Sequence, residues 1–263
     1  MRRNYLFWGS FFLVLSILYL LKAFSILKFN ILGFSWPLFL IMLGFWLILN
    51  VFWKPESRAA ELYRIGIQGA KTSSLHIVHG AGRVNISPGT NPGEFLSLKS
   101  SSEMSVDSQL IGDQLTVRLK PGTNQGPFFG NAEGFNWDLR LTSEIPISLH
   151  LETGASQTNA DFSDILVTHL KVSTGASATS ISLPVKPEKS LVEISAGVAC
   201  LELKVPGSVA AQIRVKEGLS SLNINQDRFP RIEGNLYRSL DYETSKNRTE
   251  IIVEAGVGTI KIN

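Results

Sequence analysis

One short pattern recurs six times in this sequence and constrains the fold more than any other feature. It consists of an apolar residue, any residue, a second apolar residue, any two residues and a glycine, followed by apolar positions four and often six residues later. The six glycines are Gly80, Gly154, Gly175, Gly197, Gly218 and Gly256. The four central glycines are 21, 22 and 21 residues apart, which defines a repeat unit of about 21 residues.

Each repeat alternates apolar with other residues on both sides of its glycine, as a half-buried strand does. In the copy around Gly175, Val172 precedes the glycine by three residues and Thr179 follows it by four. Because seven is odd, a strand with a two-residue period must bend or bulge at the glycine to keep both halves on one core. Glycine tolerates the unusual backbone angles, positive φ included, that such a corner can demand. We therefore expect a structural corner at each of the six glycines.

A unit of about 21 residues is too short to bury its own apolar face, but stacked units bury one another. The sequence therefore predicts an all-β repeat domain that resembles a β-solenoid. An antiparallel β-sandwich is the alternative, because it shows the same alternation and turn spacing. Recurrence of the same residue types at the same offsets favours stacking.

The N-terminal segment differs in composition from the rest of the chain. Residues 5–21 and 31–53 are free of charged side chains, and as helices they would be about 26 and 35 Å long, against a hydrocarbon core of about 30 Å. The first run extends to about residue 27 if the side chain of Lys22 reaches the membrane surface. We expect residues 1–53 to form two transmembrane helices, residues 54–69 a partly helical linker and residues 70–263 the β-repeat domain.

Basic residues predict the orientation of this chain in a membrane. They gather before the first apolar run, at Arg2 and Arg3, and after the second run, from Lys54 to Lys71, whereas the connection between the runs has only Lys22 and Lys28. Positive charges favour the cytoplasmic side. The expected location is therefore the bacterial cytoplasmic membrane, with two spans and with both termini and the β-domain in the cytoplasm.

The distribution of charged residues also indicates which kinds of partner the chain can bind. Residues 1–53 hold four of the 25 basic residues and none of the 22 acidic ones, so 21 basic and 22 acidic residues remain in 54–263. This balance gives no electrostatic reason to bind nucleic acid. Cys200 is the only cysteine, so the chain forms no internal disulfide.

A glycine-rich segment before the second repeat contains four aromatic residues, Phe128, Phe129, Phe135 and Trp137. Aromatic residues on a loop are typical of a binding surface. They also suit a plug that covers the end or edge of a solenoid. Both interpretations stay open at this point, as an interaction loop or as a structural cover.

No motif for catalysis, cofactor binding or metal binding stands out. His76 and His150 share one template position, between the two apolar residues, and should point outward. No cysteine partner or His-x-x-x-His pair accompanies them, so no metal site is predicted. Glu152 and Glu193 have the pattern of a solvated face. We therefore expect neither an enzyme nor a cofactor-binding protein.

Two parts of the chain resemble known families. "MRRNYLFWGSFFLVLSILYLL" followed by "WPLFLIMLGFWLIL" resembles the two-span region of the Lia-type membrane proteins of bacterial cell-envelope stress signalling. "WDLRLTSEIPISLHLETGAS", "LKVSTGASATSISLPV" and "IIVEAGVGTIKIN" resemble the toastrack, or "putative adhesin", β-domain. These resemblances imply a signalling accessory protein that acts through protein partners such as a sensor kinase, with no catalytic residues.

Two functions follow as hypotheses. The first is a membrane-anchored, non-enzymatic regulatory or interaction protein in bacterial envelope-stress sensing. The alternative is a surface adhesin or structural protein with its β-domain outside the cell. The expected partners are the membrane and another protein, and a homo-oligomer stays open.

Overall fold

A computed structural model describes residues 2–24, 36–37, 39–44, 61–100, 103–122 and 136–263. The chain divides into two compact units, Met1–Glu56 and Ser57–Asn263. Each unit is considered by itself.

The first unit contains helix α1 (Arg2–Ala23) and a short helical stretch within residues 36–44. Trp8 of α1 stacks on Phe39, with 6.3 Å between the ring centroids, and Phe11 meets the same ring edge-on at 5.5 Å. The two apolar runs therefore contact each other. Among the described residues, no helix combines the length and the apolar character needed to cross a membrane. Much of the second predicted span, 31–53, lies outside the described residues, and the two-span arrangement stays a prediction.

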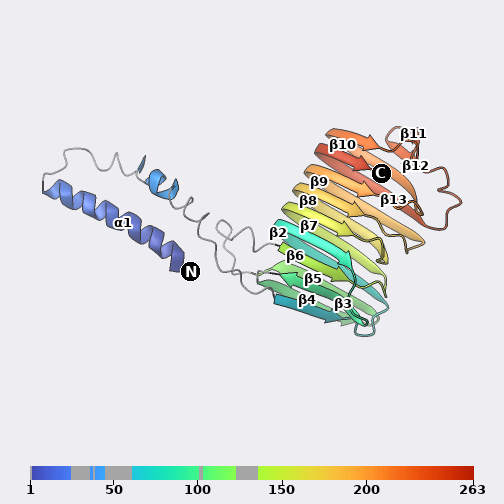
Figure 1. The fold of residues 1–263 in the computed structure, drawn as a ribbon, viewed down its shortest axis with the longest axis horizontal. Helices are drawn as coiled ribbons and strands as arrows, with labels where there is room; N and C mark the ends of the chain where they lie inside the picture. Colours follow the sequence, from blue (N-terminus) through green and yellow to red (C-terminus); the bar gives the residue numbers. More distant parts are fainter. Residues whose placement is uncertain (1, 25–35, 38, 45–60, 101–102, 123–135) are drawn as a thin grey trace. The chain divides into compact units, whose positions relative to one another are not determined.

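The second unit is built on six long parallel strands, one for each copy of the repeat (Figure 1). They are β2 (Thr72–Pro88), β7 (Ile147–Asp161), β8 (Val167–Ser182), β9 (Lys189–Lys204), β13 (Arg248–Ile262) and β10 (Ala210–Ile224), in the order of the stack. Neighbouring copies pair in register along nearly their whole length. The predicted stacking is thus confirmed for the six copies, and the antiparallel sandwich is wrong for them.

Each long strand turns a corner at its glycine, which divides it into a first arm and a second arm. In β8 the first arm buries Leu170 and Val172, and the second arm buries Thr179 and Ile181, although these two pairs differ in parity. The corner changes the phase of the alternation, as the odd gap in the template requires. Both arms therefore contribute to one continuous hydrophobic core.

The sheet separates into two layers at β2. The first arm of β2 pairs with β5 (Gln114–Pro121), whereas its second arm pairs with β6 (Asn136–Leu141). β4 (Met104–Ile111) extends the first layer beyond β5. β3 (Glu94–Ser100) and then β1 (Glu61–Gly66) extend the second layer beyond β6. The core lies between these two layers. The strands that extend the layers beyond β2 close one end of the stack.

Part of the predicted linker at 54–69 forms the strand β1. Residues 61–66 pair antiparallel with β3 instead of forming a partly helical connector. Ile65 is buried and Tyr63 packs against the core, so alternate residues of this short segment cover the end of the sheet. The segment forms a strand because its apolar side chains cover the core at the end of the sheet beside β3, which the repeats leave uncovered.

The stack does not follow the order of the chain. β13, the last copy in sequence, lies between β9 and β10, so the fifth and sixth copies exchange places relative to a simple solenoid. At the far end, β12 (Leu236–Arg238) pairs with the first arm of β10, and β11 (Arg231–Glu233) pairs with β12. The chain therefore leaves the stack after β10 and returns to fill the slot beside β9.

Candidate interaction surface and histidine cluster

The six template glycines form a column at the corners of the stack. None of the six has a positive φ; in two of the copies a positive φ lies two residues farther on, at Gly82 (122°) and Gly258 (141°). The expectation that the template glycines could supply unusual backbone angles is therefore wrong. Their role comes from a close approach between neighbouring strands, which brings one glycine against the carbonyl group of the next.

The close approach is repeated up the column. A Cβ atom built on Gly175 would lie 3.1 Å from the carbonyl oxygen of Gly154, and one built on Gly197 would lie 3.1 Å from that of Gly175. The same atom on Gly256 would lie 2.8 Å from the oxygen of Gly197. A Cβ atom built on Gly80, the first glycine of the column, would meet nothing within 4 Å. A side chain would therefore force the backbone to shift at Gly154, Gly218 and Gly256, where the Cβ atom would lie under 3.0 Å from a carbonyl oxygen, and would be tightly packed at Gly175 and Gly197.

The residues that follow the template glycines form an exposed line, which we call the corner ridge. In stack order it consists of Ala81, Ala155, Ala176, Val198, Val257 and Leu219. Its apolar side chains become larger toward β10, where Val198 is 59 %, Val257 47 % and Leu219 85 % exposed. Apolar side chains that gather on a surface are typical of a site of interaction with another protein.

The corner ridge ends at an open edge of the sheet. The second arm of β10, residues 219–224, pairs with β13 on one side. β12 covers only Gln212–Arg214 of the first arm, and within the described part of the chain no strand pairs with the other side of 219–224. An uncovered strand presents backbone N–H and C=O groups to which an extended segment of another protein can pair.

The structure describes one of the four aromatic residues of the predicted interaction loop. Trp137 lies on β6, is fully buried and meets His79 edge-on at 4.9 Å between ring centroids. Its assignment to an interaction loop is therefore wrong, because its ring fills the core at the end where β6 covers β2. Phe128, Phe129 and Phe135 lie outside the described residues.

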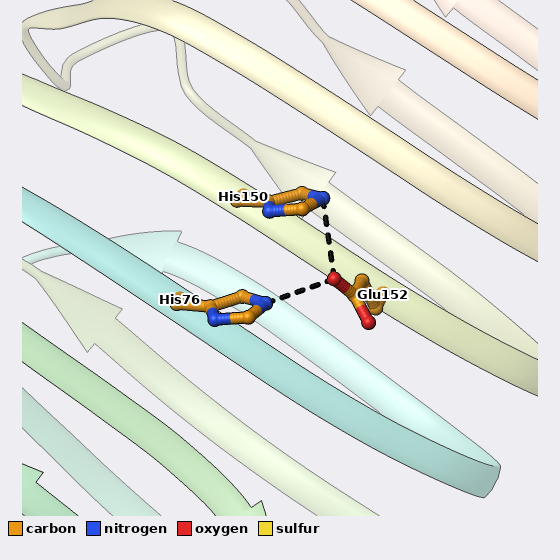
Figure 2. A group of neighbouring side chains, drawn as sticks. All are labelled: His76, His150 and Glu152. Carbon is orange, nitrogen blue, oxygen red and sulfur yellow. Dashed lines mark hydrogen bonds and ion pairs between the residues drawn. The ribbon is translucent and has the colours of Figure 1, made fainter.

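Two histidines and a glutamate meet on the outer face of the first arms (Figure 2). His76 of β2 and His150 of β7 are register partners, and their rings stack with centroids 4.7 Å apart at an angle of 7°. The Nε2 atoms of His76 and His150 lie 3.0 and 3.5 Å from Oε1 of Glu152. The outward orientation predicted for both histidines is confirmed, and Glu152, which has the pattern of a solvated face, lies within reach of both rings.

The surroundings of His150 act on its protonation. Partial burial and the neighbouring His76 lower the pKa of His150 below its ordinary value of 6.5, while Glu152 acts in the opposite direction. Lys171 and His169 on the adjacent strand lower this pKa further. The lowered pKa favours the neutral form of the His150 imidazole.

A similar pair lies on the next strands. Nε2 of His169, on β8, lies 2.9 Å from Oε2 of Glu193, on β9. This pair has one imidazole and one carboxylate, whereas the cluster at His76 has two imidazoles that share a carboxylate.

The sequence of residues 54–204 matches the family described as the N-terminal domain of toast_rack, DUF2154. This match covers more than half of the chain. The chain belongs to the toast-rack family. The stack of bent parallel strands is accordingly the toast-rack fold, and the resemblance of the repeats to this domain is confirmed.

Solved structures support the toast-rack fold. A "putative cell adhesion protein" from Clostridium sporogenes ATCC 15579 superposes with a TM-score of 0.68 at 24 % sequence identity, over 77 % of this chain and 97 % of that one. A "putative adhesin" from Bacteroides fragilis NCTC 9343 matches over the same shares of the two chains at 10 % identity, with a TM-score of 0.32. The first similarity supports the fold, and the second is too distant to add to it. No curated protein sequence is significantly similar to this toast-rack chain.

Proposed function

We propose that this toast-rack protein is a membrane-anchored, non-enzymatic interaction protein that binds another protein through the open edge of β10. The corner ridge would add apolar contacts beside that edge. The proposed setting is bacterial envelope-stress sensing, with a sensor kinase as the class of partner, in line with the resemblance of the N-terminal runs to Lia-type proteins.

The observation that carries the proposal is Leu219. It is the largest side chain of the corner ridge, it is 85 % exposed, and it begins the stretch of β10 that pairs with β13 on one side and with no described strand on the other. A leucine side chain in this position exposes apolar surface to water and contributes no burial to the hydrophobic core. A partner strand that pairs with residues 219–224 would satisfy the backbone groups of the edge and remove Leu219 from water.

The membrane anchor rests on the sequence of residues 1–53. The charge-free runs 5–21 and 31–53 have the length of membrane spans, and the basic residues flank them on the sides that favour cytoplasmic ends. In this arrangement the β-domain lies in the cytoplasm, and its partner would bind it there.

The alternative function is that of an adhesin, with the β-domain outside the cell. It is favoured by the similarity of the fold to a protein that is described as involved in cell adhesion. The two functions use the same surface and differ in the compartment where that surface lies. The location of the domain therefore separates them.

A photo-crosslinking amino acid at position 219 of the full chain tests the proposed surface in living cells. The expected result is a discrete adduct with one protein, which mass spectrometry identifies. The same amino acid at Lys186, an exposed residue in the turn between β8 and β9, is the matched control and should give no such adduct. Equal crosslinking at the two positions, or none at position 219, would refute the interaction surface, and an adduct between two copies of the chain would replace a heterologous partner with a homo-oligomer.

A further inference from the structure

We propose that His76, His150 and Glu152 form a binding site for a divalent first-row transition-metal ion of the zinc class. The site lies on β2 and β7, whereas the proposed interaction surface lies on β10 at the other end of the stack. The proposal is therefore independent of the partner-binding function.

The parallel register places the three side chains together. His76 and His150 are direct partners across the ladder between β2 and β7, and Glu152 follows His150 by two residues on the same face of β7. Figure 2 shows the two rings side by side, each with one ring nitrogen directed at the carboxylate between them. The ligands thus come from two rigid strands in the middle of a sheet, where the backbone fixes their spacing.

The distances suit a small ion. Ligand atoms arranged tetrahedrally around Zn²⁺ at about 2.0–2.1 Å lie about 3.3 Å from one another. The two nitrogen–oxygen distances in the cluster are 3.0 and 3.5 Å, and the three ligand atoms all lie within 4.8 Å of each other. One ion could contact all three ligand atoms if the side chains moved to the tetrahedral spacing of about 3.3 Å.

The donor set selects the class of metal. Two imidazoles and one carboxylate suit zinc and its first-row neighbours, whereas calcium and magnesium prefer oxygen ligands alone.

Three protein ligands leave a fourth position for water or for a ligand from another molecule. A shallow groove of about 410 Å³ adjoins the cluster and is lined by Glu152, Thr153, Ser173 and Ser195, among others. The carboxylate is shared between the cluster and this groove. The fourth position can therefore be filled from the solvent side without a change in the backbone.

A bound ion would fasten two strands that are far apart in sequence. His76 and His150 are separated by 74 positions, and all of the strands that close the first end of the stack, except β1, lie between them in the chain. A metal that binds the folded state and not the unfolded chain stabilises the fold by mass action. The inferred role is thus a metal-dependent clasp between β2, which carries the end-closing strands, and β7, the next copy of the repeat stack.

Zinc titration of the full chain, purified without a histidine tag and freed of metal with a chelator, tests the site. Calorimetry should give one Zn²⁺ per chain, and Co²⁺ in its place should give the visible absorption of a four-coordinate ion. His76→Gln, His150→Gln and Glu152→Gln should each weaken zinc binding more than about tenfold, because even outer-shell partners of metal ligands contribute about 10–100-fold to affinity. Zinc should also raise the melting temperature of the wild-type protein and not that of the three variants.

His169→Gln is the matched control, because His169 lies on the same face and pairs with a glutamate but belongs to no three-ligand cluster among the residues that the structure describes. It should bind zinc as the wild type does. Melting temperatures in chelator separate a loss of ligands from a loss of fold. Absence of saturable binding at millimolar zinc, or equal affinity in the wild type and the three cluster variants, would overturn the proposal.

Discussion

The backbone of Gly154 approaches Gly80 so closely that a Cβ atom on Gly154 would lie 2.4 Å from the carbonyl oxygen of Gly80. The relationship is not mutual, since a Cβ atom on Gly80 would meet nothing within 4 Å. The side chain that each template glycine lacks would point at the neighbouring copy on one side only. The column of glycines therefore has a direction, from β2 at its open beginning to β10 at its end.

This direction predicts opposite effects for one substitution at two equivalent positions. Gly154→Ala should lower the free energy of unfolding by about 1–3 kcal/mol, the usual cost of forcing atoms into a packed site. Gly80→Ala, with open space and no positive φ, should be neutral or stabilise by up to about 1 kcal/mol through the unfolded state. Urea denaturation of both variants measures the difference, and equal destabilisation at the two positions would contradict the steric explanation.

The lowered pKa of His150 predicts how stability depends on pH in metal-free buffer. His150 has a lower pKa in the folded than in the unfolded state, so the unfolded chain binds more protons between the two values. The contribution of His150 to stability is therefore complete above pH 6.5 and is lost as the pH falls from 6.5 through the folded pKa. His150→Gln should flatten this dependence, as seen by urea denaturation at a series of pH values.

A direct titration provides the control for this pH effect. NMR of the His150 ring should give a pKa below 6.5, and His76→Gln should raise it because one of the causes of the shift is removed. A pKa of His150 at or above 6.5 in the wild type would contradict the sign of the effect.

Cys200 makes the location of the β-domain measurable without a fusion protein. It is the only cysteine of the chain and it is exposed on the outer face of β9. If the domain is cytoplasmic, a maleimide that cannot cross membranes should label Cys200 only after the cells are made permeable. Cys200→Ser controls for labelling elsewhere. Full labelling of intact cells would favour the adhesin function instead.

Leu219→Asp should separate binding from stability. Because Leu219 is 85 % exposed and packs against no core residue, the free energy of unfolding should change by no more than about 0.5 kcal/mol. Crosslinking of the partner from a neighbouring position such as Ser221 should nevertheless be lost, since a charge opposes burial of the edge. Val253→Asp, in the core of the adjacent strand, is the contrasting variant and should unfold the domain. Undiminished crosslinking in a folded Leu219→Asp chain would contradict the role of the ridge.

The sequence by itself determined the repeat unit and the corner, and it favoured a stack over an antiparallel sandwich. The odd gap between Val172 and Thr179 can be reconciled with one core only if the strand changes direction between them. The shared offset of His76 and His150 likewise placed both outward and, once the stack is in register, side by side. These features follow from local periodicity, which is written into every copy.

Tertiary structure alone decided which copies are neighbours and what caps them. Each copy offers the same kind of face above and below, so the local pattern cannot encode that β13 lies between β9 and β10. Residues 61–66 form β1, and Trp137 lies in the core, because apolar side chains at the end of the stack bury surface that the repeats leave uncovered. Glu152 meets two histidines because register joins β2 to β7 across 74 positions of sequence. Alternation fixes which face a side chain takes, whereas its neighbours on that face depend on strands that the chain brings together only when it folds.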